Sequence, residues 1–189
     1  MKNELASVER ASAQVGSLLT ASGSSVVVGS DVVGSNPLDV PDLGGLTLGY
    51  TELTDNGVVN STTSYAVIDA DAKVTFTAPK SGNVEILASL YIDDTSSSVY
   101  DYFLGLSTAS TYSSLGNAYE RKVARQDTTD DQTMDVYFCV TGLTPGQSYT
   151  YYLGQKNSDL ANKNRVLWGD GYPSLIMHAK SLPASIYTG

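Results

Sequence analysis

Hydrophobic and polar residues change their pattern at about residue 45. From Leu46 onward, short alternating runs of the two kinds are separated by turn residues. A period of two is typical of strands that bury one face, and many short strands between turns indicate a sandwich or barrel. The pattern therefore predicts an all-β fold, an antiparallel β-sandwich. Its strands are expected at 46–53, 65–68, 73–78, 84–92, 100–107, 119–125, 133–141, 149–156, 165–168 and 174–182.

Two of these strands carry apolar side chains along one whole face. Such faces are expected where two sheets pack against each other. The inward-pointing residues are expected to be Val84, Ile86, Ala88, Leu90 and Ile92 in the first strand, and Val136, Phe138 and Val140 in the second.

The first residues follow a different period. Over 4–19, apolar positions recur three or four apart, which predicts a short helix with an a/d seam. Two heptads are too few for a stable coiled coil, so the helix is either an amphipathic terminus without a role or an element that docks or oligomerises. In the second case the contacts come from Leu5, Val8, Val15, Leu18 and Leu19.

Between this helix and the sandwich, residues 22–45 are rich in Gly, Ser, Val and Asp. Asn36 and Val40 each precede a proline, which favours extended backbone. The segment is either a loose linker or, given its valines, a strip that lies along another protein. We therefore expect residues 1–45 to form a helix and an extended anchoring segment, and residues 46–189 to form one β-sandwich domain.

Composition excludes several classes of function. Charged residues make up 16% of the chain, against roughly 25% in ordinary soluble domains, and the net charge is −9. Few, scattered cations argue against nucleic-acid binding. Glu4, Glu9 and Arg10 stand where a signal peptide needs apolar residues, and no apolar run approaches the roughly 20 residues of a membrane span. The chain is expected to be made in a cytoplasm without membrane insertion.

Histidine and cysteine, two residue types that often carry catalysis, occur once each. His178 is the single histidine, so it has no second imidazole for a metal site and no nucleophile beside it in sequence. Cys139 is the single cysteine, which excludes an intrachain disulfide. It alternates with Phe138 and Val140 and is interpreted as a buried structural thiol. No catalytic residues are expected, and we do not expect an enzyme.

One predicted loop gathers four carboxylates within nine residues. Oxygen ligands at this density are typical of calcium sites, although the spacing does not match an EF-hand. A solvated acidic loop and a glycosidase carboxylate pair are the other interpretations. Calcium is thus the only cofactor to consider, and its ligands would be Asp127, Asp130, Asp131 and Asp135.

A second motif, Trp168-Gly-Asp170-Gly-Tyr172, places two aromatic side chains and a carboxylate around glycines. Aromatic rings can stack on sugar faces while a carboxylate accepts hydroxyl hydrogen bonds. The motif is therefore a candidate glycan site. The alternative is a turn whose Trp and Tyr cap the sandwich.

The segment from Val140 to Tyr149, with Leu-Thr-Pro-Gly at 143–146, resembles the E–F corner of fibronectin-type and other sandwich domains. The resemblance implies that Leu143 fills the core and that the Tyr149 hydroxyl bonds to nearby backbone.

A broader likeness covers about residues 72–183. It rests on the order of Val74-Thr-Phe-Thr-Ala-Pro-Lys-Ser-Gly, Phe103-Leu-Gly-Leu-Ser, the Leu-Thr-Pro-Gly corner, and Trp168-Gly-Asp-Gly-Tyr. This order resembles the jelly-roll-like β-sandwich domains of tailed-bacteriophage fibre, spike and head-decoration proteins. It implies a homotrimeric virion structural protein, fixed to portal, tail or capsid partners by its N-terminal segment. The alternatives are a carbohydrate-binding module that recognises host glycans and, least favoured, a glycan-cleaving enzyme.

Overall fold

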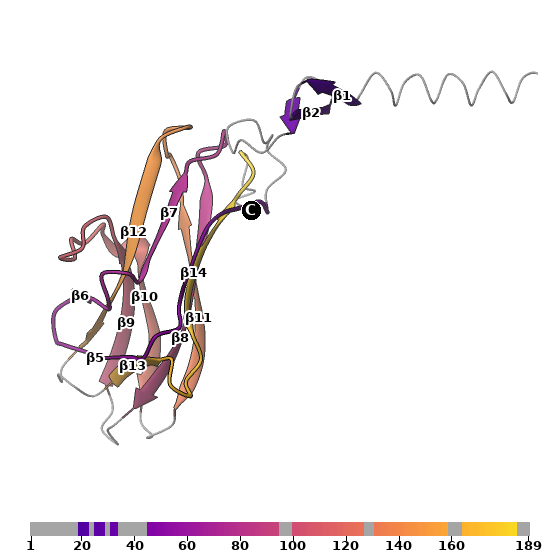
Figure 1. Ribbon diagram of the computed structural model, residues 1–189. Coiled ribbons are helices and arrows are strands. Elements are labelled where there is room, and N and C mark those ends of the chain that lie inside the picture. The colour runs from indigo at the N-terminus through magenta and orange to yellow at the C-terminus, as the bar shows by residue number, and fades with distance from the viewer. Residues whose placement is uncertain are drawn as a thin grey trace, which may run out of the picture.

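The computed structural model describes residues 19–22, 25–28, 31–33, 45–94, 100–126, 131–158 and 164–184. From residue 45 onward the fold is a β-sandwich of two antiparallel sheets (Figure 1). The predicted fold class is therefore confirmed. The predicted N-terminal helix lies outside the described residues, except for Leu19, which begins a strand. In the part of the chain that is described, no helix is long and apolar enough to cross a membrane.

The larger sheet is built around its longest strand, β8. The strand order is β4-β14-β8-β13-β5, and β11 pairs with the other side of β8. β14 and β13 follow one another along the same edge of β8, since β14 pairs with 84–89 and β13 with 91–94. The bounds are β4 (Thr47–Leu53), β5 (Gly57–Asn60), β8 (Val84–Asp94), β11 (Gln132–Val140), β13 (Asn164–Trp168) and β14 (Leu175–Ser181).

The smaller sheet covers one face of the larger one (Figure 1). Its order is β10-β9-β12-β6, with β7 also paired to β12. A short 3-10 helix, η1 (Asn117–Tyr119), leads into β10. The bounds are β6 (Ala66–Val67), β7 (Lys73–Thr77), β9 (Tyr100–Ser107), β10 (Glu120–Gln126) and β12 (Ser148–Asn157).

The core lies between the two sheets, where the alternating residues of β8 and β11 face inward. All eight predicted inward residues of these strands are buried, at most 6% exposed. They pack against Leu104 and Leu106 of β9 and Leu153 of β12, which are fully buried. Burying an aliphatic or aromatic side chain stabilises the fold by roughly 1.5–3 kcal/mol, so this layer is the main source of stability.

All ten predicted strands are present, each end within two residues of its predicted position. Strand β5 was not predicted. It is short, and it follows Asp55 and Asn56, which are typical of turns.

Residues 19–22, 25–28 and 31–33 form three short antiparallel strands in a sheet of their own, in the order β1-β2-β3. The sequence predicted extended backbone here but not pairing within the segment. The bounds are β1 (Leu19–Ser22), β2 (Ser25–Val28) and β3 (Asp31–Val33). The predicted division into an anchoring segment and a sandwich domain at residue 45 stays a prediction.

The corner between β11 and β12 has the geometry that the resemblance implied. The Thr144 N–H donates to the Tyr149 hydroxyl at 3.0 Å, and Leu143 packs against the core. The Leu143 N–H donates to the Gly82 carbonyl at 3.0 Å, which ties the corner to the turn before β8. A hydrogen bond of this kind contributes about 1 kcal/mol.

Candidate functional site

The candidate site lies beside Trp168, at the end of β13. Trp168 is directly opposite Gly57 of β5 in the strand register. Its indole lies against that glycine: a Cβ at position 57 would be 2.0 Å from Cε2 and Cζ2 of the ring. Trp168 is only 5% exposed, because its side chain belongs to the core and strand backbone also covers the ring at Gly57.

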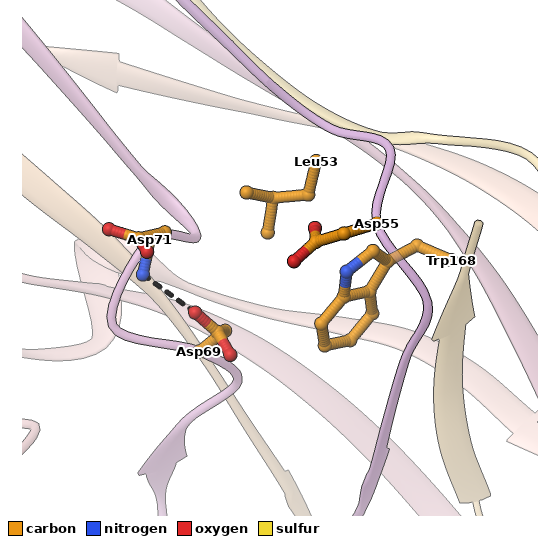
Figure 2. A pocket seen from close by; sticks show the side chains of 5 residues that line it. All are labelled: Leu53, Asp55, Asp69, Asp71 and Trp168. Atoms are coloured by element: carbon orange, nitrogen blue, oxygen red, sulfur yellow. Dashed lines mark hydrogen bonds between the residues drawn. The ribbon is translucent and has the colours of Figure 1, made fainter.

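A pocket of about 40 Å³ opens at the edge of this indole (Figure 2). Leu53 and Asp55 come from the end of β4 and the connection to β5, and Asp69 and Asp71 come from the turn before β7. Figure 2 shows Asp55 near the indole, with Asp69 and Asp71 across the pocket. Three carboxylates from two connections thus meet one buried aromatic ring.

The polar groups of the pocket are unequally satisfied. The Asp69 carboxylate accepts from the Asp71 N–H at 2.8 Å, and the Asp71 carboxylate pairs with the Lys73 ammonium at 3.0 Å. Among the described residues, the Trp168 indole N–H and the Asp55 carboxylate have no hydrogen-bond partner. The pocket thus presents both acceptors and one free donor.

This mixture of groups favours a hydroxyl-bearing ligand. A hydroxyl can donate to a carboxylate and accept from an indole N–H, whereas an ammonium can only donate. No cluster of three or more His, Cys, Asp or Glu side chains within the described ranges has the geometry of a metal site. A volume of about 40 Å³ holds water or the hydroxyl edge of one sugar, but not a whole sugar ring.

The predicted glycan motif is split by its turn. Trp168 points inward, while Asp170 and Tyr172 are exposed. Asp170 has a φ of 46°, and its carboxylate accepts from the Asn56 amide at 3.4 Å. The Tyr172 ring lies 5.3 Å from that of Tyr91. The structure therefore does not bring the three residues to one surface, and the covered face of Trp168 is not open to a stacking sugar.

The predicted calcium ligands are described only in part. Asp127 and Asp130 lie outside the described residues. Asp131 is exposed and accepts from the Tyr91 hydroxyl at 2.9 Å, a hydrogen bond that raises the pKa of Tyr91. Asp135 is exposed within β11 and is not part of a loop. The calcium site stays a prediction.

The predicted anchoring residues Leu5, Val8, Val15 and Leu18 also lie outside the described part of the chain. Only the strand position of Leu19, in β1, is described. Their role in docking or oligomerisation stays a prediction.

The buried role predicted for Cys139 is wrong. Because Phe138 and Val140 face the core, the residue between them points outward, and Cys139 is exposed. His178 also lies on the outer face of the larger sheet, in register with Tyr50 and Leu87. Burial, followed by the charge of Lys180, lowers the pKa of His178.

A second aromatic cluster, which the sequence did not indicate, lies on the smaller sheet. Tyr112 rests on the paired glycines Gly105 and Gly154: added Cβ atoms would lie 2.2 and 2.3 Å from its side chain. Tyr65 stacks on Tyr112 with a centroid distance of 4.5 Å and an interplanar angle of 9°. Lys156 lies 4.4 Å from the Tyr65 centroid. Burial raises the pKa of both tyrosines.

Comparison with family models and with curated proteins gave no match. Among solved structures, the chain is similar to the PRD1 vertex protein P5, with 14% identity and a TM-score of 0.34, over 89% of this chain and 83% of that one. It is also similar to the CBM22-1–GH10 modules of Clostridium thermocellum xylanase 10B, solved with xylohexaose. There the identity is 8% and the TM-score 0.31, over 77% of this chain and 30% of that one. These likenesses concern the sandwich fold alone.

Proposed function

We propose that this chain is a non-enzymatic bacteriophage virion structural protein of the fibre, spike or decoration type. The observation that supports an assembly role is the edge strand β11, which pairs only with β8 among the described residues. A long unpaired strand edge tends to associate with other chains unless a partner covers it. The assignment to a virion comes from the resemblance over residues 72–183.

In this proposal the N-terminal segment attaches the protein to portal, tail or capsid partners, and the sandwich faces outward. The apolar seam from Leu5 to Leu19 is proposed to dock or oligomerise, and three copies are the number that the resemblance implies. The protein is then made in the host cytoplasm and resides in the virion.

Location in a particle tests the proposal directly. Antibodies raised against the purified full-length chain should label the surface of phage particles from the host that carries the gene, by immunogold electron microscopy. Labelling only of cell lysate, with purified particles unlabelled, would rule out the virion role. A single species of 20.0 kDa in light scattering at micromolar concentration would count against multiple copies.

The pocket beside Trp168 favours a second candidate function, recognition of a host glycan. Its free indole N–H and the carboxylates of Asp55, Asp69 and Asp71 are complementary to adjacent hydroxyls on the rim of a sugar. Binding would occur through hydrogen bonds to the indole edge, since the ring face is covered by Gly57.

A glycan array followed by calorimetry tests this second function. Trp168→Phe keeps an aromatic ring but removes the N–H, and Asp55→Asn removes a charged acceptor. Each is expected to weaken binding about fivefold to tenfold, which corresponds to one hydrogen bond of about 1–1.4 kcal/mol. Tyr172→Ala is the matched control at the exposed end of the motif. Binding that is lost in Tyr172→Ala but kept in Trp168→Phe would contradict this site.

A further inference from the structure

The strands at the borders of the two sheets differ in how they are protected against pairing. Natural edge strands are blunted by bulges, by charge, by proline or by shortness. β10 has a bulge between Lys122 and Ala124 and carries both Arg121 and Lys122. The β4–β14 ladder has a register shift at Ala179. β5 has four residues and β6 has two, and β7 carries Lys73.

β11 has no bulge and no proline, and it is long, so a single charge is its one protecting device. It runs for nine residues, and its register along β8 is unbroken from Gln132 to Val140. Asp135 is its single charged residue, and it contains no proline, glycine or lysine. Tyr137 on its outward side is 53% exposed. Within the described ranges, its second edge has no strand beside it.

We propose that β11 pairs antiparallel with β11 of a second copy about a two-fold axis, which joins the larger sheets of both copies into one. This inference rests on the proposed assembly role, but it sets the contact at two copies in place of the three that the resemblance implies. An identical strand is the occupant because a two-fold operation brings the same edge to itself, so one surface patch serves both copies.

The register follows from length and charge. Pairing centred on Val136 is the only one in which all nine residues of each strand overlap. It places Asp135 opposite Tyr137 of the second copy, whereas centring one residue earlier would place two Asp135 carboxylates directly opposite each other. Like charges directly opposite are destabilising. The same register places Thr133 opposite Cys139 of the second copy, with both side chains on the outer face.

Disulfide crosslinking tests this register. In Thr133→Cys, each new cysteine should face native Cys139 of the other copy, within the 4.4–6.8 Å Cα separation that a disulfide needs. Mild oxidation should give a reducible dimer on a non-reducing gel. An intrachain bond is excluded, because the two positions are six residues apart on one extended strand.

Two single-cysteine proteins are the matched controls: the wild type, and Thr133→Cys combined with Cys139→Ser. Neither should crosslink, since each cysteine then faces a hydroxyl. Equal crosslinking in all three proteins, or none in Thr133→Cys, would overturn the register.

A second measurement does not depend on cysteine chemistry. Tyr137→Asp places a carboxylate directly opposite Asp135 of the second copy, and sedimentation should change from two copies to one. Tyr50→Asp makes the same change at a tyrosine of similar exposure, 55%, on the outer face at β4, and should leave two copies. A sedimentation mass of three copies that Tyr137→Asp leaves unchanged would contradict the two-fold contact. If the antibodies did not label phage particles but Thr133→Cys still formed the disulfide-linked dimer, only the virion role would be contradicted.

Discussion

Two aromatic rings in this molecule rest on glycine backbone, and they have different surroundings. Trp168 lies against Gly57 on the larger sheet, and Tyr112 lies against Gly105 and Gly154 on the smaller one. In both places the missing Cβ lets a flat ring contact the strand. The arrangement on the sheet is therefore shared.

The difference lies in what covers each ring's remaining edge. Tyr112 is stacked by Tyr65, and its hydroxyl is buried without a hydrogen-bond partner in the described part of the chain. Trp168 instead borders a pocket with carboxylates opposite its N–H. A glycine opposite an aromatic residue thus allows the ring to lie against the strand. The neighbouring loops determine whether the polar atom of the ring is accessible to a ligand.

Removal of each ring should give the largest difference in stability between the two sites. Trp168→Ala is expected to lower the free energy of unfolding by about 3–5 kcal/mol, because the ring is almost fully buried. Tyr112→Ala should lower it by roughly 2 kcal/mol, since its half-buried ring lies on the outer face. Urea unfolding at constant slope measures both. If both variants lost the same free energy of unfolding, the Trp168 ring would contribute no more to the core than the Tyr112 ring.

Substitution of the glycines that contact these rings should lower stability by smaller amounts, again more at Trp168 than at Tyr112. Gly57→Ala forces a Cβ into a buried indole and should destabilise by about 3 kcal/mol, whereas Gly154→Ala meets a half-buried ring on the outer face and should cost about 1–2 kcal/mol. Val58→Ala, at a neighbouring side chain that is 58% exposed, is the control and should change little. Thermal melts of the three variants give the ranking, and a tolerated Gly57→Ala would contradict the seating of Trp168.

The smallest effect concerns the hydroxyl of Tyr112. Because it is buried without a partner, Tyr112→Phe should leave stability at pH 7 unchanged or raise it by up to about 1 kcal/mol. The folded state holds the pKa of Tyr112 above its ordinary value of 10.0, mainly through burial. The unfolded chain therefore releases this proton first, and stability falls as the pH rises above 10. Tyr112→Phe should lose less stability than the wild type between pH 9 and pH 11; an identical loss would show that the hydroxyl is solvated.

Most of the sandwich could be predicted because alternation reports directly on burial. Along β8 and β11 every second residue is apolar, and those residues are the ones that face the smaller sheet. β5 escaped prediction because its apolar residues, Val58 and Val59, are adjacent, and because Asn56 and Gly57 are typical of a turn. Cys139 was misplaced although alternation between Phe138 and Val140 already predicts an outward side chain.

The candidate site could be predicted only in its tryptophan. Asp55, Asp69 and Asp71 lie far from Trp168 in sequence. Asp55 meets it because β5 pairs with β13, whereas Asp69 and Asp71 come from the turn before β7 of the smaller sheet. No local pattern reports such a pairing. The Asp-Ala-Asp turn at 69–71 is a weak signal, since acidic residues are common in turns. The burial of Trp168 could not be predicted either, because it depends on the glycine opposite it in the neighbouring strand.

The position of β14 has a consequence for biosynthesis. This strand, which is synthesised last among those of the sandwich, lies between β4 and β8 and forms ladders with both. Until residues 175–181 have left the ribosome, β4 has no paired strand in its sheet and the edge of β8 over 84–89 stays open. Long-range pairing of this kind slows folding and leaves nascent chains prone to aggregation. Yield from a cell should therefore depend on how long emerging chains are shielded by chaperones.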